Sequence, residues 1–292
     1  MGQQVLNGVF VGSIYALFAV GYTLVFGVLD ILNLAHAAVF MLSAFAALAL
    51  VADLHLSIWL ALPLGTLCGG VLGVALERVA FRPLRGRSDS NISGLISSLA
   101  VATVFEAIAL QIFGPDVSRF PQGTFPDRMI HIGGAGASLL QLCIVAISVA
   151  LMGLLTLLLA RTRLGRQIRA VAESPRAARI LGVNVDRVIA LAFFISSALG
   201  GAAGVLFGLA FNSISPDVGR SVELKGLAVI ILGGMGSVPG AVIAGFLLGL
   251  IEVYTVSHLG SSYRDAVSFA VLFLVLVARP GGLLGRAAAR EA

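Results

Sequence analysis

Long apolar runs separated by short polar segments dominate this chain. Most are about 20 residues long, which is the length an α-helix needs to cross a membrane. The ten-residue alternation typical of membrane-barrel strands is absent from the sequence. We read nine runs as candidate spans: 6–29, 34–51, 57–76, 92–113, 138–160, 188–211, 224–232, 241–258 and 266–278. The pattern predicts an all-α, polytopic membrane bundle of about eight to nine spanning segments in a single domain, 1–292.

Two glycine-containing breaks interrupt these runs, at 27–37 and at 233–240 (GGMGSVPG). The run 224–232 is too short to cross alone and predicts half of a broken or re-entrant helix. Broken helices in both halves of a transporter point to the translocation path, and packing around a turn is an equally weighted reading of the second break. The path candidates at the breaks are Asn33, His36, Gly233, Gly234, Gly236 and Ser237.

Two carboxylates within the apolar runs, Glu106 and Glu252, are further path candidates, because an ionisable group at membrane depth needs a function or a partner. For Glu252 the alternative is that it reaches the interface from near the end of its run. For Asn33 and His36 we favour a helix-capping asparagine and a satisfied buried histidine over direct contact with a ligand.

Composition agrees with a protein solvated by lipid. Hydrophobic residues make up 59% and charged residues 11% of the chain, against about 25% charged in soluble domains. The net charge of +5 does not indicate nucleic-acid binding, because the charges fall between spans. Fourteen of the nineteen basic residues lie on one predicted side, which the positive-inside rule makes cytoplasmic, together with the C-terminus. The N-terminus is external if all three early spans cross.

Motifs for energy conversion and catalysis are absent from the sequence. The lone lysine, Lys225, lies in ELKGL, which is no P-loop. We find no H-E-x-x-H or G-x-S-x-G motif, and the four histidines lack metal-ligand spacing. We therefore expect no enzyme, no metal site and no cofactor in this chain; ATP and Mg²⁺ would belong to a partner chain.

The polar segment 161–187 offers a place for such a partner. Ser174 suits an N-cap, Pro175 the first helical turn and Gly182 the C-terminal exit. These residues predict a helix over 175–181. Ala177, Ala178 and Leu181 are expected on one shallow side that a partner could approach closely.

The pattern E-x-x-x-A-A-x-x-x-G, formed by Glu173, Ala177, Ala178 and Gly182, resembles the coupling segment of ABC importer permeases. The chain as a whole resembles permease subunits of branched-chain amino acid ABC importers. The resemblance rests on NGVFVGSIYALFAVGYTLVFG (7–27), NLAH (33–36), LERVAFRPLR (76–85), LGVNVDRVIAL (181–191), LGGMGSVPGA (232–241) and RPGGLLG (279–285). One departure is Ala37, where the family usually has glycine.

The resemblance implies a multi-pass permease of the bacterial inner membrane for branched-chain or related amino acids. It implies a second, related permease subunit (a heterodimer), two ATP-binding subunits and an extracytoplasmic solute-binding protein. Related importers carry urea, short amides and other small amino-acid-like solutes, so the substrate stays open. The alternative from another class is an ion-coupled carrier that depends on Glu106 and Glu252.

Overall fold

The computed structural model describes residues 2–85, 90–126, 128–132, 135–279 and 281–285. Its long elements are helices, as the apolar runs predict. They are α1 (Gly2–Leu29), α2 (His36–Ala52), α3 (Ile58–Leu76), α4 (Ser90–Phe113), α5 (Leu139–Arg161), α6 (Arg163–Glu173), α7 (Pro175–Ile180), α8 (Val185–Phe211), α9 (Val218–Gly233), α10 (Val238–Leu259) and α11 (Arg264–Ala278). Short π and 3-10 turns, Glu77–Phe81 and Arg82–Leu84, follow α3, and a 3-10 turn, Ser261–Tyr263, precedes α11.

Seven helical segments of the described chain are long and apolar enough to cross a membrane, and α2 is a shorter apolar helix. The prediction of a polytopic helical membrane protein is therefore confirmed. The run 224–232 forms the second half of α9, a helix of 16 residues. At 1.5 Å per residue it is about 24 Å long, short of the roughly 30 Å hydrocarbon core.

One feature differs from the all-α prediction. Strands β1 (Met129–Ile132) and β2 (Ala135–Ser138) form an antiparallel hairpin between α4 and α5. The side chain of Gln3 bonds both the amide and the carbonyl of Gly136, at 3.0 and 2.9 Å. The hairpin is thereby fastened to the start of α1.

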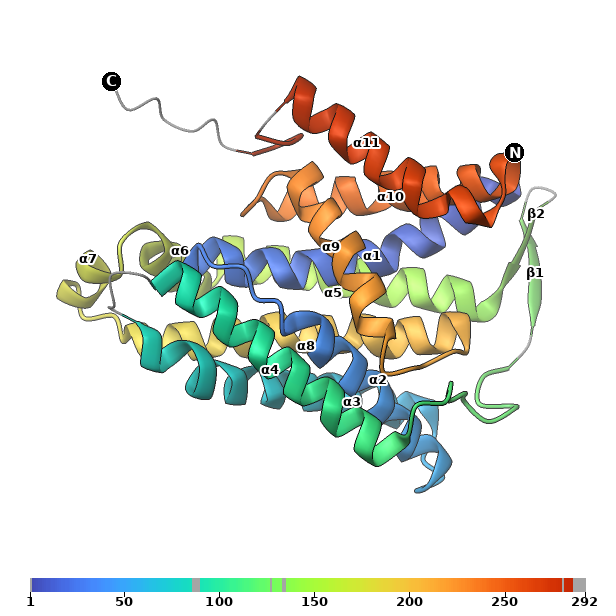
Figure 1. Cartoon of the computed structure of the whole chain (residues 1–292), viewed down its shortest axis with the longest axis horizontal. Coiled ribbons are helices and arrows are strands. Elements are labelled where there is room, and N and C mark those ends of the chain that lie inside the picture. The colour runs from blue at the N-terminus through green and yellow to red at the C-terminus, as the bar shows by residue number, and fades with distance from the viewer. Residues whose placement is uncertain (1, 86–89, 127, 133–134, 280, 286–292) are drawn as a thin grey trace.

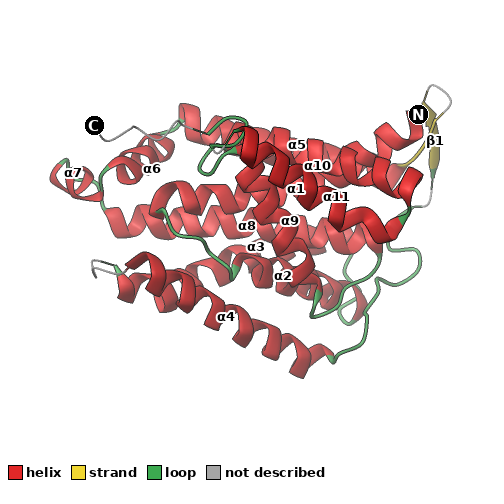
Figure 2. Ribbon diagram, turned by 45° about the horizontal axis from the view of Figure 1, so that its top comes forward, coloured by secondary structure: helices red, strands yellow, loops and turns green. Residues whose placement is uncertain are grey.

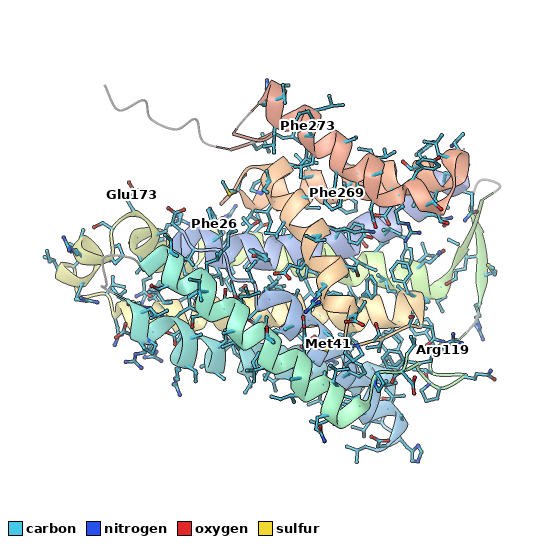
Figure 3. All side chains as sticks on the ribbon, viewed as in Figure 1. Phe26, Met41, Arg119, Glu173, Phe269 and Phe273 are labelled. Atoms are coloured by element: carbon cyan, nitrogen blue, oxygen red, sulfur yellow. The ribbon has the colours of Figure 1, made fainter. Side chains whose placement is uncertain are left out.

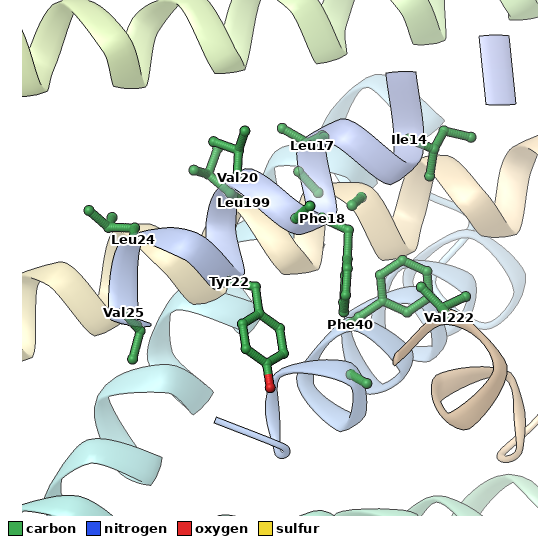
Figure 4. Packing of buried hydrophobic residues seen from close by; sticks show 14 of the residues in the cluster. Ile14, Leu17, Phe18, Val20, Tyr22, Leu24, Val25, Phe40, Leu199 and Val222 are labelled. Atoms are coloured by element: carbon green, nitrogen blue, oxygen red, sulfur yellow. The ribbon is translucent and has the colours of Figure 1, made fainter. Parts of the chain in front are cut away.

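Helix α1 is the centre of the bundle, and its residues 12–25 are all buried. It packs against α10, α8, α5 and α9, while α8 also packs against α3 and α2. Phe18, Tyr22 and Phe40 fill the space between α1 and α2 (Figure 4). Glycine lets α1 and α10 approach closely: a Cβ on Gly245 would meet the backbone of Ala16.

The outer helices present apolar side chains to their surroundings, as lipid requires. Leu99 and Val104 of α4, Leu157 of α5 and Phe273 of α11 are all exposed. Figure 3 shows Phe269 and Phe273 on α11, at the edge of the bundle.

The two ends of the bundle differ in what they carry. The N-terminus and the β-hairpin lie at one end, whereas α6 and α7 lie at the other (Figures 1 and 2). Glu173 and Arg119 mark these opposite ends in Figure 3. Arg87, Arg286 and Arg290, which belong to the arginine count above, lie outside the described residues.

Candidate functional site

The segment between α5 and α8 projects from the end of the bundle as two capped helices (Figure 1). Ser174 accepts a hydrogen bond from the Ala177 amide at 3.2 Å, Pro175 occupies the first turn, and Gly182 follows the helix with φ +81°. The prediction of a short helix over 175–181 is confirmed to within one residue, because α7 ends at Ile180.

The predicted shallow side of α7 is not a single surface. Ala178 is only 1% exposed and points into the protein, whereas Ala177 and Glu173 are exposed. Successive helical residues are separated by about 100°, which carries Ala178 away from Ala177. The tip is instead formed by Ile180 and Leu181, which are 86% and 79% exposed.

Both ends of this segment are fastened to spanning helices. The guanidinium of Arg169 donates to the backbone carbonyl of Leu159, so that α6 is bonded to the end of α5. At the other end, the amide of Val183, in the turn before α8, donates to the carbonyl of Ala178 at 3.0 Å, Asn184 caps α8 by accepting from the Arg187 amide, and α6 and α7 pack against α8. A displacement of α7 would therefore act on α5 and α8 together.

An ion network joins α8 to the turns that follow α3. Arg85 contacts the buried carboxylate of Glu77 and donates to Asp186 at 3.0 Å, and Arg82 lies 3.6 Å from Asp186. The arginine-rich turns after α3 thus share the end of the bundle that carries α7.

His36 is buried where the first break ends. Its ring lies 4.9 Å from the Phe18 ring and 5.3 Å from the Tyr22 ring, and a Cβ on Gly200 would come within 2.7 Å of it. Within the described chain, neither ring nitrogen makes a hydrogen bond of normal geometry. The histidine is buried as we favoured, but these nitrogens are not satisfied.

Asn33 does not cap a helix with its side chain. The N-cap of α2 is Ala35, without a side-chain cap. Asn33 is buried, and its side-chain atoms have no hydrogen-bond partner among the described residues. The capping role is wrong, because the chain turns through the backbone bond from the His36 amide to the Asn33 carbonyl instead.

The second break lies beside the first. Gly234 and Gly236 have φ of +98° and +83°, a backbone region that favours glycine. Ser237 caps α10 by accepting from the Gly240 amide at 3.2 Å. A Cβ on Gly27 would lie 3.8 Å from Gly236, so the two breaks are neighbours.

The C-terminal segment also meets this break. The amide of Leu283 donates to the Leu232 carbonyl, and that of Leu284 donates to the Gly233 carbonyl.

Glu252 is the buried centre of an ion cluster that joins α1, α9, α10 and α11, in which the side chains of Arg264 and Asp265 are 39% and 65% exposed. Its Oε1 lies 3.0 Å from Lys225 Nζ, 3.2 Å from Arg264 Nε and 3.1 Å from the Tyr15 hydroxyl, which donates to it. Asp265 lies 3.3 Å from Lys225. Glu252 is 2% exposed, so its carboxylate is covered by the described protein rather than presented at its surface.

Glu106 has a different environment. It pairs at 3.1 Å with Arg220, whose side chain is 70% exposed. The pair bridges α4 and α9 at the edge of the bundle.

A cavity of about 330 Å³ adjoins the Glu252 cluster. It lies towards the N-terminal end of α1. The polar residues that line it are Gln4, Asn7, Gln141, Glu252, Ser257 and Arg264.

Sequence reasoning missed Tyr15, Lys225, Arg264 and Asp265 as members of this cluster. The sequence did contain a signal for the Lys225–Glu252 pair. The only lysine of the chain lies at the edge of one apolar run, and a glutamate lies within another. Charges at membrane depth are expected to find partners.

Comparison with known proteins gives the chain relatives over nearly its whole length. Residues 4–276 match the family model described as branched-chain amino acid transport system, permease component. The chain is 36% identical to BraD of Pseudomonas aeruginosa and to LivH of Escherichia coli, both high-affinity branched-chain amino acid transport permease proteins, over 97% of the chain and 95% of each relative. It is 26% identical to the ribose import permease protein RbsC of Haemophilus influenzae, over 94% and 84%.

Proposed function

The chain belongs to the family of permease components of branched-chain amino acid transport systems, and we propose that it carries branched-chain amino acids inward as the membrane subunit of an ABC importer. ATP hydrolysis, with its ATP and Mg²⁺, takes place on two separate ATP-binding subunits. A second, related permease subunit completes the pathway, and an extracytoplasmic solute-binding protein delivers the substrate.

The exposed tip of α7 is the observation that carries this proposal. Ile180 and Leu181 are the most exposed of the large hydrophobic residues described. They lie on a capped helix that projects beyond the spans (Figure 1). Apolar side chains presented in this way mark a protein-binding surface, and Arg176 and Arg179 beside them add charge to its rim.

We place the α7 end in the cytoplasm of a bacterial inner membrane, because the arginine-rich segments gather there. The C-terminus is then cytoplasmic, and the start of α1 with the β-hairpin is extracytoplasmic.

In this mechanism, movement of the ATP-binding subunits displaces α7. The bond from Arg169 to Leu159 carries the displacement into α5, and the packing of α6 and α7 against α8 carries it into α8. The Arg85–Asp186 pair extends it to the turns after α3. The neighbouring breaks, with Asn33 and His36 on one and Gly233, Gly234, Gly236 and Ser237 on the other, are where the path opens.

The test is a double substitution, Ile180→Asp with Leu181→Asp, in cells that express the whole importer. We expect leucine uptake and copurification of the ATP-binding subunit to be lost while the permease still inserts. Ala177→Arg, at an exposed neighbouring position, should act in the same direction. The control is Leu54→Asp, an exposed leucine in the turn between α2 and α3, at the opposite end. Normal uptake by the double variant would refute the docking role.

The similarity to a ribose import permease favours testing other solutes as well. Uptake of leucine, urea, acetamide and ribose by the same cells decides the substrate class. Vesicles without ATP test the alternative of an ion-coupled carrier: uptake that persists there, and stops in Glu106→Gln and Glu252→Gln, would replace the ABC mechanism.

A further inference from the structure

Two residues of the ion cluster, Glu252 and Arg264, also line the cavity, and each has a polar group that the cluster leaves over. All the described contacts of the Glu252 carboxylate are made by Oε1, while Oε2 is buried and has no hydrogen-bond partner among the described residues. Arg264 faces Glu252 through Nε. Its two terminal nitrogens make no ion pair with any of the described residues.

These two groups are side by side and opposite in charge. An α-amino acid carries its ammonium and carboxylate on one carbon, so it presents opposite charges at the same short separation. An ammonium group supplies the hydrogen-bond donor that Glu252 Oε2 lacks, and a carboxylate accepts from the free end of the Arg264 guanidinium. Charge-assisted bonds of this kind are the strong ones.

The rest of the cavity suits an aliphatic side chain. Phe10, Val11, Phe211, Val253 and Val256 line it beside the polar residues. Its volume, about 330 Å³, lies at the lower end of the roughly 300–1,000 Å³ usual for small-molecule sites. The lining therefore combines a charged pair at one place with an apolar wall elsewhere.

We propose that this cavity is a recognition site for a zwitterionic aliphatic α-amino acid, with Glu252 binding the ammonium and Arg264 the carboxylate. This inference rests on the proposed function and locates the substrate within the permease. In the proposed orientation the site lies in the extracytoplasmic half, where a solute released by the binding protein enters. Lys225 and Tyr15 position the Glu252 carboxylate by occupying Oε1.

The experiment measures ligand binding to the whole importer complex in nanodiscs, without its solute-binding protein, by saturation-transfer NMR. The probes are L-leucine, leucinamide, which lacks the carboxylate, and 4-methylpentanoate, which lacks the ammonium. We expect wild type to prefer leucine over either analogue by about tenfold, because each analogue loses a charge-assisted bond. Glu252→Gln should remove the preference over 4-methylpentanoate, and Arg264→Gln the preference over leucinamide.

A variant that avoids the ion cluster protects the test against misfolding. Val256→Trp fills the cavity from its apolar wall and should abolish the leucine signal. Val277→Trp makes the same change on an exposed position of α11 away from the cavity and should retain it. A leucine signal that is absent from wild type, or that persists in Val256→Trp and Glu252→Gln alike, overturns the site.

Uptake by wild type with its binding protein, measured in parallel, separates the two proposals. Leucine uptake without a specific cavity signal refutes the site alone. Absence of uptake of any branched-chain amino acid refutes the proposed substrate, and with it this inference.

Discussion

Two clusters of buried polar groups lie along one stripe of α1, and they are built in opposite ways. Tyr22 lies beside His36 at the first break, and Tyr15 lies in the Glu252 cluster. The two tyrosines are seven residues apart, which places them on the same side of a helix. Around Tyr22 the rings pack tightly and the polar atoms lack partners, whereas around Tyr15 opposite charges pair through Glu252 Oε1 and two members of the cluster line a cavity.

This difference shows that burial of a polar group does not by itself mark a binding site. The His36 ring packs directly against Gly200, where no side chain would fit, so its contacts are mainly steric. Glu252 lies within 3.2 Å of three donor groups through Oε1, its buried Oε2 has no hydrogen-bond partner among the described residues, and the residue lines a cavity. Steric packing dominates the cluster around His36, whereas ion pairs dominate the cluster around Glu252.

We expect the largest effect on stability from removing Lys225, the cation at the centre of the Glu252 cluster. Lys225→Met leaves the Glu252 carboxylate buried with less compensation, and breaking a buried pair in this way costs about 3–5 kcal/mol. We expect a loss of that order in equilibrium unfolding of the permease in mixed micelles. The double variant Lys225→Met with Glu252→Met should recover part of it, because both buried charges are gone. A single-variant loss below about 1 kcal/mol would mean that the cluster is well solvated.

The two tyrosines of α1 provide a matched pair. The Tyr15 hydroxyl donates to Glu252 and accepts from Lys225, so Tyr15→Phe should cost about 1.5–3 kcal/mol, as for hydrogen bonds to charged groups. The Tyr22 hydroxyl has no hydrogen-bond partner among the described residues, so Tyr22→Phe should be nearly neutral. The same unfolding measurement compares them, and equal losses would erase the distinction between the clusters.

Adding one methyl group tests how tightly the cluster around His36 is packed. Gly200→Ala would place a Cβ within 2.7 Å of the His36 ring, and overpacking of this kind costs about 1–3 kcal/mol. His36→Ala in the same chain should relieve the clash, which makes the two effects non-additive. Unfolding of both single variants and the double variant gives the coupling energy. Additive losses would show that the helices separate without resistance from the ring.

The features of this chain that the sequence predicts well are those set by residues close together along the chain. The caps of α7 lie within a few residues of the helix they bound, and Ser174, Pro175 and Gly182 place it to within one residue. The spans follow from run length alone. The exposed tip was missed in part, because the side that Ala178 faces depends on how α7 packs against α6 and α8.

The ion cluster depends on contacts that no local pattern contains. Tyr15 and Glu252 are separated by 237 positions along the chain, and Lys225 and Glu252 by 27. The apolar runs identify both carboxylates, Glu106 and Glu252, as unusual. They cannot tell that the first pairs with an exposed arginine at the edge of the bundle and the second with a buried lysine at its centre.

The smallest effect is expected from that exposed pair, which serves as the reference for the buried one. Arg220 is largely exposed, and exposed ion pairs contribute about 0.2–1 kcal/mol. Arg220→Gln should therefore lower the unfolding free energy by no more than about 1 kcal/mol, and less in high salt, since salt screens exposed charges. The loss in Lys225→Met should change less with salt, because Glu252, one of the two carboxylates that Lys225 contacts, is buried. Equal salt dependence of the two variants would show that water and ions reach Glu252 as freely as Glu106, and the distinction between a pair at the edge and a cluster at the centre would then fail.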